Sequence, residues 1–251
     1  MQPDAKPSAV SEAENELVMS FLAVRRALGF LGIALPLSLL LVAGLTAEPM
    51  RASMSEFYFG RAGDLFVGIL CAIGVFLWAY VGYPPKDRGE WPTDRMVSRI
   101  AALAAVLVAL VPTLDKMAVP ENPARGCSVL QCLLGDEISR MVHYGAAAVF
   151  FGCLAVFCLV LFRRDGGQMS RGKRARNRIY GLCGWMIVAS MGALALFGVV
   201  YRMQDAAGQA AMDATYLVFM LEAVGVVAFG ISWLIKGETL KPLQRLMQTA
   251  D

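Results

Sequence analysis

The sequence is poor in charge and in histidine, and each shortage limits what the protein can be. Only 17% of its 251 residues are charged, whereas soluble domains carry about 25%. The charges are missing mainly from long apolar blocks, which is the pattern of a polytopic membrane protein and leaves little sequence for a soluble domain. The single histidine, His143, excludes a metal site built from three histidines of one chain.

The chain also has few cysteines in polar surroundings. Four of its six cysteines lie in apolar runs, where they are expected to pack as small buried hydrophobes; these are Cys71, Cys153, Cys158 and Cys183. Only Cys127 and Cys132 fall in a polar loop, and the spacing CSVLQC predicts a disulfide that closes a small loop. A metal-binding pair is the alternative, although such a pair usually has C-x-x-C spacing and further ligands nearby.

Apolar blocks predict an all-α membrane protein with a bundle of six transmembrane helices. About 20 helical residues cross a hydrocarbon core of roughly 30 Å. The predicted spans are 27–47, 65–83, 100–114, 141–162, 179–201 and 214–235. Residues 1–26 are interpreted as an N-terminal tail with an interfacial amphipathic helix, and 236–251 as a cytoplasmic tail. The third span is short, so Arg99 and Asp115 are expected to reach for the two membrane surfaces.

Small residues predict close helix contacts in two of these spans. In the third span they are Ala101, Ala105 and Ala109, and in the fifth they are Gly181, Gly184, Gly192 and Gly198.

The distribution of basic residues predicts the orientation. Six spans place both termini on one side, and 17 of the 23 lysines and arginines fall on that side, seven of them within 163–178. The positive-inside rule then predicts that both termini lie on the cytoplasmic side of the membrane, which is interpreted as a bacterial inner membrane. The basic loop is interpreted as a topology determinant facing anionic lipid, not as a nucleic-acid site, because no aromatic pattern or fold for nucleic acid accompanies it.

Four ionisable residues from four spans are predicted to share the outer leaflet. Asp64 begins the second span, Asp115 closes the third and His143 begins the fourth, while Glu222 lies about 12 Å into the sixth. An ionised group is costly in lipid, so Glu222 is expected to face the bundle interior, a partner or a wet cavity.

Three of these four residues could instead have simpler structural roles. Asp64 could cap its helix, Asp115 could be an ordinary rim residue, and His143 could bond to a backbone carbonyl.

The segment before the second span adds further candidates for a pocket at this rim, namely Ser55, Glu56, Tyr58 and Arg61. Asp64, His143 and Glu222 together could hold Zn²⁺ with an open water position. Without a metal, the same groups could pass protons or bind a cationic or hydroxylated lipid headgroup.

Short motifs carry two resemblances. Ser55–Phe59, Asp64–Gly68 and Phe229–Trp233 resemble a group of uncharacterised bacterial six-helix integral membrane proteins. More distantly, the outer Ser55, Asp64 and His143 are similar to those of the CREST membrane hydrolases, which include the alkaline ceramidases. That second resemblance implies zinc-dependent hydrolysis of lipid amides. The CREST enzymes have seven spans and a three-histidine zinc site, whereas this chain has six predicted spans and one histidine.

Three functions remain open from the sequence. The first is an outward-facing polar pocket that binds a lipid headgroup or small molecule for sensing, transport or scaffolding. The second is a metal-dependent hydrolase of lipid amides or esters, and the third is a proton-coupled transporter using Glu222.

Overall fold

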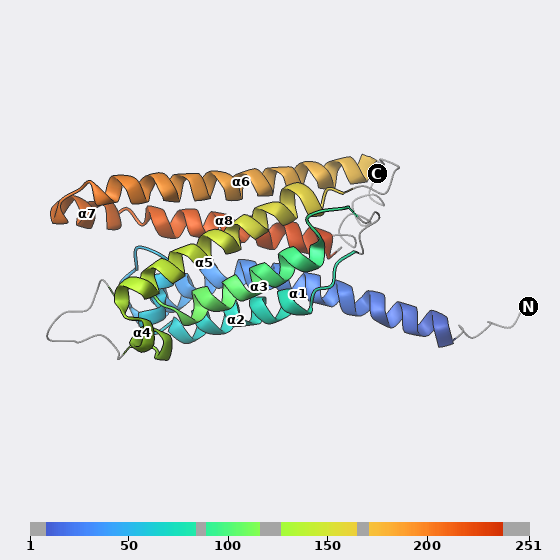
Figure 1. Cartoon of the computed structure of the whole chain (residues 1–251), viewed down its shortest axis with the longest axis horizontal. Helices are drawn as coiled ribbons and strands as arrows, with labels where there is room; N and C mark the ends of the chain where they lie inside the picture. The colour runs from blue at the N-terminus through green and yellow to red at the C-terminus, as the bar shows by residue number, and fades with distance from the viewer. Residues whose placement is uncertain (1–8, 84–88, 116–126, 165–170, 238–251) are drawn as a thin grey trace, which may run out of the picture.

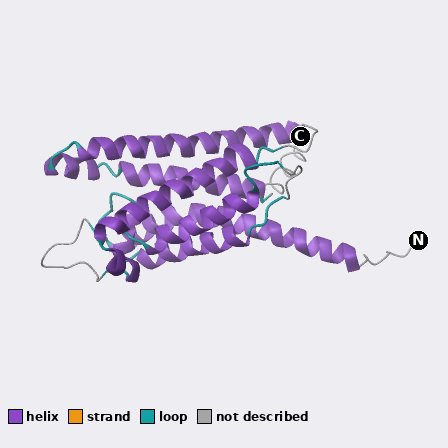
Figure 2. Cartoon of the chain, viewed as in Figure 1, coloured by secondary structure: helices purple, strands orange, loops and turns teal. Residues whose placement is uncertain are grey.

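The computed structural model describes residues 9–83, 89–115, 127–164 and 171–237, and it describes the side chains of these ranges except those of 9–20 and 171. Within these ranges the chain is all helical and has no strand (Figure 2). The long helices are α1 (Ala9–Thr46), α2 (Gly63–Ala79), α3 (Asp94–Leu110), α5 (Asp136–Val156), α6 (Arg171–Arg202) and α8 (Leu217–Lys236). The short elements are the 3₁₀ helix η1 (Ser55–Phe59), α4 (Val129–Leu134), the π-helical turn η2 (Phe157–Leu161) that continues α5, and α7 (Ala206–Asp213).

The six long helices lie side by side in one bundle (Figure 1). Helix α8 packs against α1 and α6, and α3 packs between α2 and α5. The end of α8 and the α2–α3 connection lie at one end of the bundle, from which the first turns of α1 project; we call this the terminal end. Helices α4 and α7 and the α1–α2 connection lie at the opposite end, which we call the far end.

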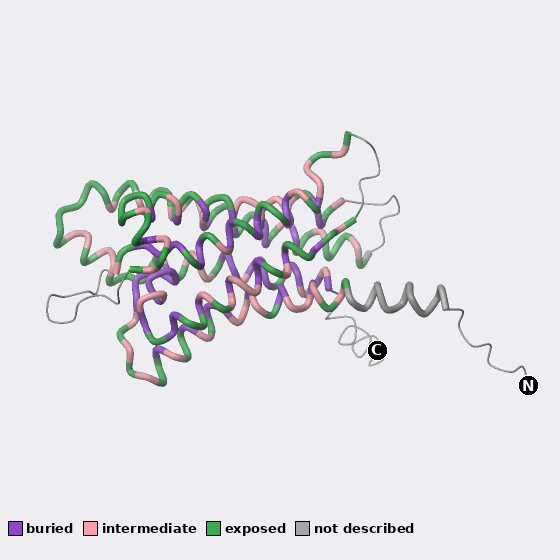
Figure 3. The backbone as a smooth tube through the Cα atoms, turned by 60° about the horizontal axis from the view of Figure 1, so that its bottom comes forward, coloured by how far each residue is buried: buried purple, intermediate pink, exposed green. Residues whose placement is uncertain are grey.

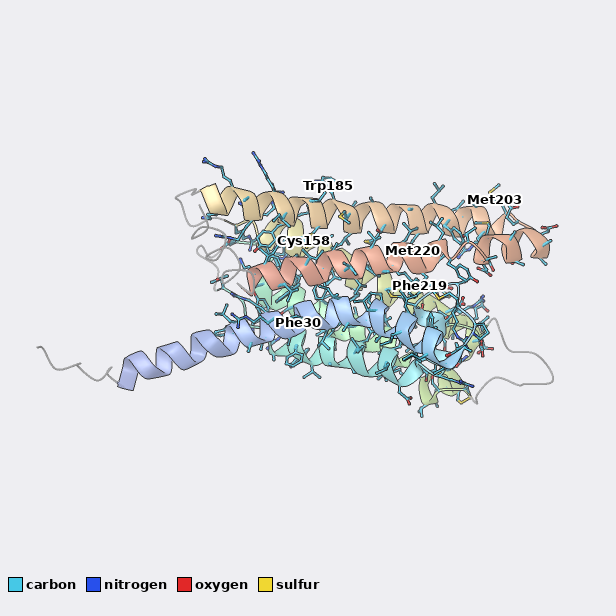
Figure 4. All side chains as sticks on the ribbon, turned by 180° about the vertical axis from the view of Figure 1, so that it is seen from behind. Phe30, Cys158, Trp185, Met203, Phe219 and Met220 are labelled. Carbon is cyan, nitrogen blue, oxygen red and sulfur yellow. A yellow bond between two sulfur atoms is a disulfide. The ribbon has the colours of Figure 1, made fainter. Side chains whose placement is uncertain are left out.

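Among the residues that the structure describes, four helices are long and apolar enough to cross a membrane. They comprise Phe21–Thr46, Asp136–Leu161, Gly172–Arg202 and Leu217–Lys236. Large apolar side chains also cover the outside of the bundle, as with Leu41, Trp185 and Leu196, and Figure 4 shows Trp185 on the outer side of α6. An apolar exterior of this size fits contact with lipid. The helical membrane class predicted from the sequence is therefore confirmed at this level.

Two helices extend beyond their predicted spans at the N-terminal side. Helix α1 is one continuous 38-residue helix that covers both the predicted interfacial helix and the first span. Helix α6 begins at Arg171, so part of the predicted basic loop forms its first two turns. Lysine and arginine are good helix formers, which explains why the helix continues into this polar stretch.

Two other helices stop short of their predicted spans at one end. Helix α3 ends at Leu110, because Pro112 follows within two residues and disfavours helical backbone at Val111. Helix α8 begins at Leu217, after Tyr216 in the left-handed region at φ 52°. That residue turns the chain between α7 and α8, where a continuous helix could not.

Helices α1 and α8 approach each other closely at two glycines. A Cβ atom added at Gly29 would lie 2.6 Å from Leu234 Cγ, and one added at Gly230 would lie 2.8 Å from the Gly29 carbonyl oxygen. Both distances are too short for any side chain, so glycine at these positions permits the contact.

The small residues named from the sequence have different outcomes. Ala101, Ala105 and Ala109 are buried as predicted. Gly184 lies against Leu159, and a Cβ on Gly181 would only approach Arg163 at 3.9 Å. No described atom lies within 4 Å of a Cβ built at Gly192 or Gly198, so the close packing predicted for those two is wrong within this chain. Burial on α6 ends at Ser190 (Figure 3).

Aromatic side chains fill the terminal end. The Trp233 ring lies 4.9 Å from the Tyr80 ring, 5.2 Å from Phe157 and 5.1 Å from Phe162, measured between centroids. The buried Arg25 guanidinium lies over the Tyr80 ring at 5.7 Å.

Candidate functional site

The α1–α2 connection folds back into the far end of the bundle. Its residues 51–57 are buried. The Phe219 backbone N–H on α8 donates to the Ala52 carbonyl at 2.9 Å, and the Met54 N–H donates to Glu222 Oε2 at 2.7 Å. The Phe57 and Phe219 rings pack at 5.8 Å between centroids, and Figure 4 labels Phe219 on α8. These contacts tie the first connection of the chain to its last helix.

Short polar contacts give this connection its shape. The Glu56 carboxylate accepts a hydrogen bond from the Ala52 N–H at 3.2 Å, and the Glu56 N–H donates to Ser53 Oγ at 3.3 Å. The Ser53 and Ser55 hydroxyls lie 3.4 Å apart. A buried turn needs such partners, because an unbonded backbone group away from water costs about as much as a lost hydrogen bond.

Arg51 links the connection to the segment that follows α3. Its guanidinium lies 3.2 Å from Asp115 Oδ1 and 3.4 Å from Glu48 Oε1, and all three side chains are largely buried. Glu48 also accepts the Arg61 N–H at 3.0 Å, and the Arg61 guanidinium donates to the Thr46 carbonyl at 2.9 Å. Asp115 therefore closes the far end as one member of an ion-pair cluster.

A mostly apolar cavity lies beneath this connection, inside the bundle. Its polar lining residues are Ser55, His143 and Glu222. The apolar lining comes from α1, α2, α3, α5, α8 and the connection, and consists of Leu35, Met54, Phe66, Leu70, Val108, Ala147, Phe150, Phe151 and Val226. Three polar groups from three distant segments thus share one largely apolar space.

His143 is fixed in one tautomer by a backbone carbonyl. Its side chain is only 2% exposed, and Nδ1 lies 2.7 Å from the Val111 carbonyl oxygen. A carbonyl only accepts hydrogen bonds, so Nδ1 carries the proton and Nε2 is an acceptor. Among the described residues Nε2 has no hydrogen-bond partner. His143 therefore bonds to a backbone carbonyl, which is the simpler of the roles expected from the sequence. Its second ring nitrogen, Nε2, can still accept a hydrogen bond.

Glu222 is a half-buried carboxylate with one hydrogen bond and no ion pair to balance its charge in the described part of the chain. Its Oε2 accepts the Met54 N–H. Glu56, only 5% exposed, lies on the same connection, where its carboxylate accepts the Ala52 N–H. A carboxylate within a membrane bundle is costly unless a proton or cation balances it.

The structure separates the residues predicted for this rim. Ser55, His143 and Glu222 line the cavity, whereas Glu56 is buried within the α1–α2 connection. Asp115 pairs with Arg51, Tyr58 packs on the neighbouring Phe59 ring at 5.2 Å, and Arg61 and Asp64 are exposed.

The metal site predicted from Asp64, His143 and Glu222 is not assembled. No group of three or more His, Cys, Asp or Glu side chains in the described ranges could hold a metal ion. Asp64 lies exposed in the first turn of α2, where an acid is stabilised by the positive helix N-terminus. The donors present do not fit a protein-bound zinc ion at this cavity.

Cys127 and Cys132 are joined by a disulfide at the far end. Ser128, between them, caps α4 by accepting the Gln131 N–H at 3.1 Å. The disulfide lies at the surface, and neither cysteine lines the cavity.

The sequence did not indicate several residues of this site. Glu48, Arg51 and Ser53 were not recognised, nor was the backbone N–H of Met54. The available signal was the pair of charges Glu48 and Arg51 in a short connection between apolar spans, since such charges need a partner when they are buried.

No family model, curated protein or solved structure matches the chain.

Proposed function

We propose that this chain is a multi-pass protein of the bacterial inner membrane, and that its far-end cavity binds a lipid headgroup or a small molecule. The observation that supports this function is the convergence of Ser55, His143 and Glu222 on one mostly apolar cavity. Ligand sites commonly combine apolar walls with a few converging polar groups. Binding of this kind would serve sensing, transport or scaffolding.

Six spans with cytoplasmic termini form part of the proposal. Helices α2 and α3 have 17 residues each, about 25 Å of helix, and lie beside the four longer helices. The basic turns of α6 lie at the terminal end, which supports a cytoplasmic position for that end. The far end, with its disulfide, would then face the oxidising side of the membrane.

The polar groups favour binding over hydrolysis. The Ser55 hydroxyl lies beside that of Ser53, and the only hydrogen bond of His143 in the described structure is to Val111. A serine nucleophile needs a base within hydrogen-bond reach, and the predicted zinc donors are not gathered. The lining groups are placed to hold a small polar group in a mostly apolar space.

Co-purification tests this function. The wild type, Glu222→Gln and Asp64→Asn would be purified in mild detergent and examined by native mass spectrometry. Asp64→Asn is the matched control, because it removes a carboxylate from the same end of the bundle but outside the cavity. We expect the wild type and the control to retain the same bound molecule and Glu222→Gln to retain about tenfold less, the effect of losing one charged hydrogen bond. Equal retention by all three proteins would contradict the proposal.

A further inference from the structure

We infer that the terminal end carries a surface site for the head group of an anionic phospholipid, where α1, α8 and the residue Tyr83 after α2 meet. Its cations are Arg25 and Arg26 on α1 and Lys236 in the last turn of α8. None of these residues lines the far-end cavity, so the inference is independent of the function proposed for that cavity.

The Tyr83 ring brings together two cations from different helices. The Arg25 guanidinium carbon and Lys236 Nζ each lie 5.2 Å from the centre of this ring, so the two charges are no farther apart than twice that distance. Tyr83 is 58% exposed. The cluster therefore reaches the surface at this aromatic side chain.

Arg26 adds a third cation beside Lys236. Its Nε donates to the carbonyl of Gly237, the residue that follows Lys236, at 3.0 Å. This bond uses one of the five N–H groups of the guanidinium. The other four have no hydrogen-bond partner among the described residues, and a guanidinium binds phosphate oxygens well.

Arg25 is buried without a carboxylate partner. It is 7% exposed, and its Nε has no hydrogen-bond acceptor. No ion pair joins it to an acid in the described part of the chain. The Tyr80 and Tyr83 rings offset part of the cost of its burial, but a buried cation is stabilised further by a nearby anion. An anionic head group at the adjoining surface would supply that charge.

The acids described at this end do not cancel the three cations. Asp94 is buried and accepts hydrogen bonds from the Tyr80 hydroxyl and the Tyr83 N–H, both at 3.3 Å. It compensates one cation at most. Glu90 pairs with Arg164 at 3.3 Å. The excess positive charge favours an anion, and basic sites between membrane helices commonly bind anionic head groups.

The outer face of α1 favours a lipid over a free anion. Phe30 lies one helical turn after Arg26 on the same side of α1 (Figure 4). Leu37 and Leu41 continue that face at helical spacing, and all three side chains are exposed. A head group at Arg26 would thus lie next to an apolar surface for its acyl chain.

Matched lipids test the inference. The full chain in mild detergent would be titrated with phosphatidylglycerol and phosphatidylcholine of identical acyl chains, and the bound lipid counted by native mass spectrometry. The two lipids differ in net charge, because choline neutralises the phosphate. We expect phosphatidylglycerol to bind about twentyfold more tightly, since each of two surface cations is worth about fivefold.

Variants locate the binding. Arg26→Gln and Lys236→Gln remove a charge and keep hydrogen-bond donors, and each should weaken phosphatidylglycerol binding about fivefold while leaving phosphatidylcholine binding nearly unchanged. Arg99→Gln is the matched control, because Arg99 is an exposed cation over the Trp78 ring at 5.2 Å and lies outside the cluster. It should change neither affinity. Thermal unfolding of each variant establishes that it is folded.

Two results would contradict the site directly. Equal affinity of the wild type for the two lipids would overturn the inference. Equal losses of phosphatidylglycerol binding in Arg26→Gln, Lys236→Gln and Arg99→Gln would also overturn it, because the effect would then come from overall charge and not from this cluster.

A soluble anion distinguishes a lipid from free phosphate. Excess inorganic phosphate at constant ionic strength should leave phosphatidylglycerol binding nearly unchanged, because phosphate has no acyl chain to lie on α1. Displacement of the lipid by phosphate would show that the cluster takes a free anion and would overturn the lipid inference.

Discussion

At the scale of single residues, Arg51 determines how the acids of the far end are arranged. It pairs with Glu48 and Asp115 while remaining 7% exposed. Removing one member of a buried ion pair leaves its partner charged, buried and uncompensated. The resulting loss of stability is larger than the net stabilisation that the intact pair provides.

We therefore expect Arg51→Met to lower the free energy of unfolding by about 3–5 kcal/mol. Arg61→Met is the matched control, since Arg61 is exposed, and it should lower this free energy by about 1 kcal/mol or less. Unfolding by a denaturing detergent in mixed micelles, followed by tryptophan fluorescence, would measure both. Equal losses would show that the Arg51 cluster is not specially stabilising.

Sequence reasoning at this scale identified types of residue more reliably than their partners. It named Ser55, His143 and Glu222, because isolated polar groups in apolar spans are conspicuous. It also placed Asp64 with them, since four spans were expected to bring their outer ends together. The side of α2 on which Asp64 lies depends on how that helix is rotated within the bundle. The partners of His143 and Glu222 are Val111 and Met54, which are distant in sequence, so no local pattern could identify them.

At the scale of elements, the contact between α1 and α8 relies on glycine. We expect Gly230→Val to lower the free energy of unfolding by about 1–3 kcal/mol, because the added side chain would meet the α1 backbone. Gly192→Val, where no described atom is near the new Cβ, is the matched control in helix propensity and volume. The same detergent unfolding measures both. If the two variants lost equal stability, the effect would come from valine in a helix and not from the contact.

The elements themselves were largely predictable, because each follows from a local apolar block. The residues at which these elements begin and end were less predictable. Pro112 truncates α3, the basic residues of α6 continue its helix, and Tyr216 separates α7 from α8. Each boundary depends on backbone preferences of one or two residues that an apolar count does not register.

At the scale of the whole molecule, the topology gives a direct prediction. In intact bacterial cells, a membrane-impermeant maleimide should label Arg61→Cys at the far end and leave Arg174→Cys at the terminal end unlabelled until the membrane is permeabilised. Both positions are exposed. The unsubstituted chain is the control, since its Cys127 and Cys132 are joined and its other cysteines lie in helices. Labelling of Arg174→Cys alone in intact cells would reverse the proposed orientation.

The helical membrane class was predictable from composition, and the structure supports it through four long apolar helices. Six crossings and their direction stay predictions, because α2 and α3 are short enough that length alone does not decide them.

The hydrogen bonds that join Ala52 and Met54 to α8 also bear on biosynthesis: the Ala52 carbonyl accepts from Phe219, and the Met54 N–H donates to Glu222. Ribosomes make α8 last, so a nascent chain already carries its first connection while the partners Phe219 and Glu222 are still to be translated. The cavity can close only when the final helix enters the membrane. Until then the Met54 N–H lacks its acceptor, so the buried form of the first connection is completed only at the end of synthesis.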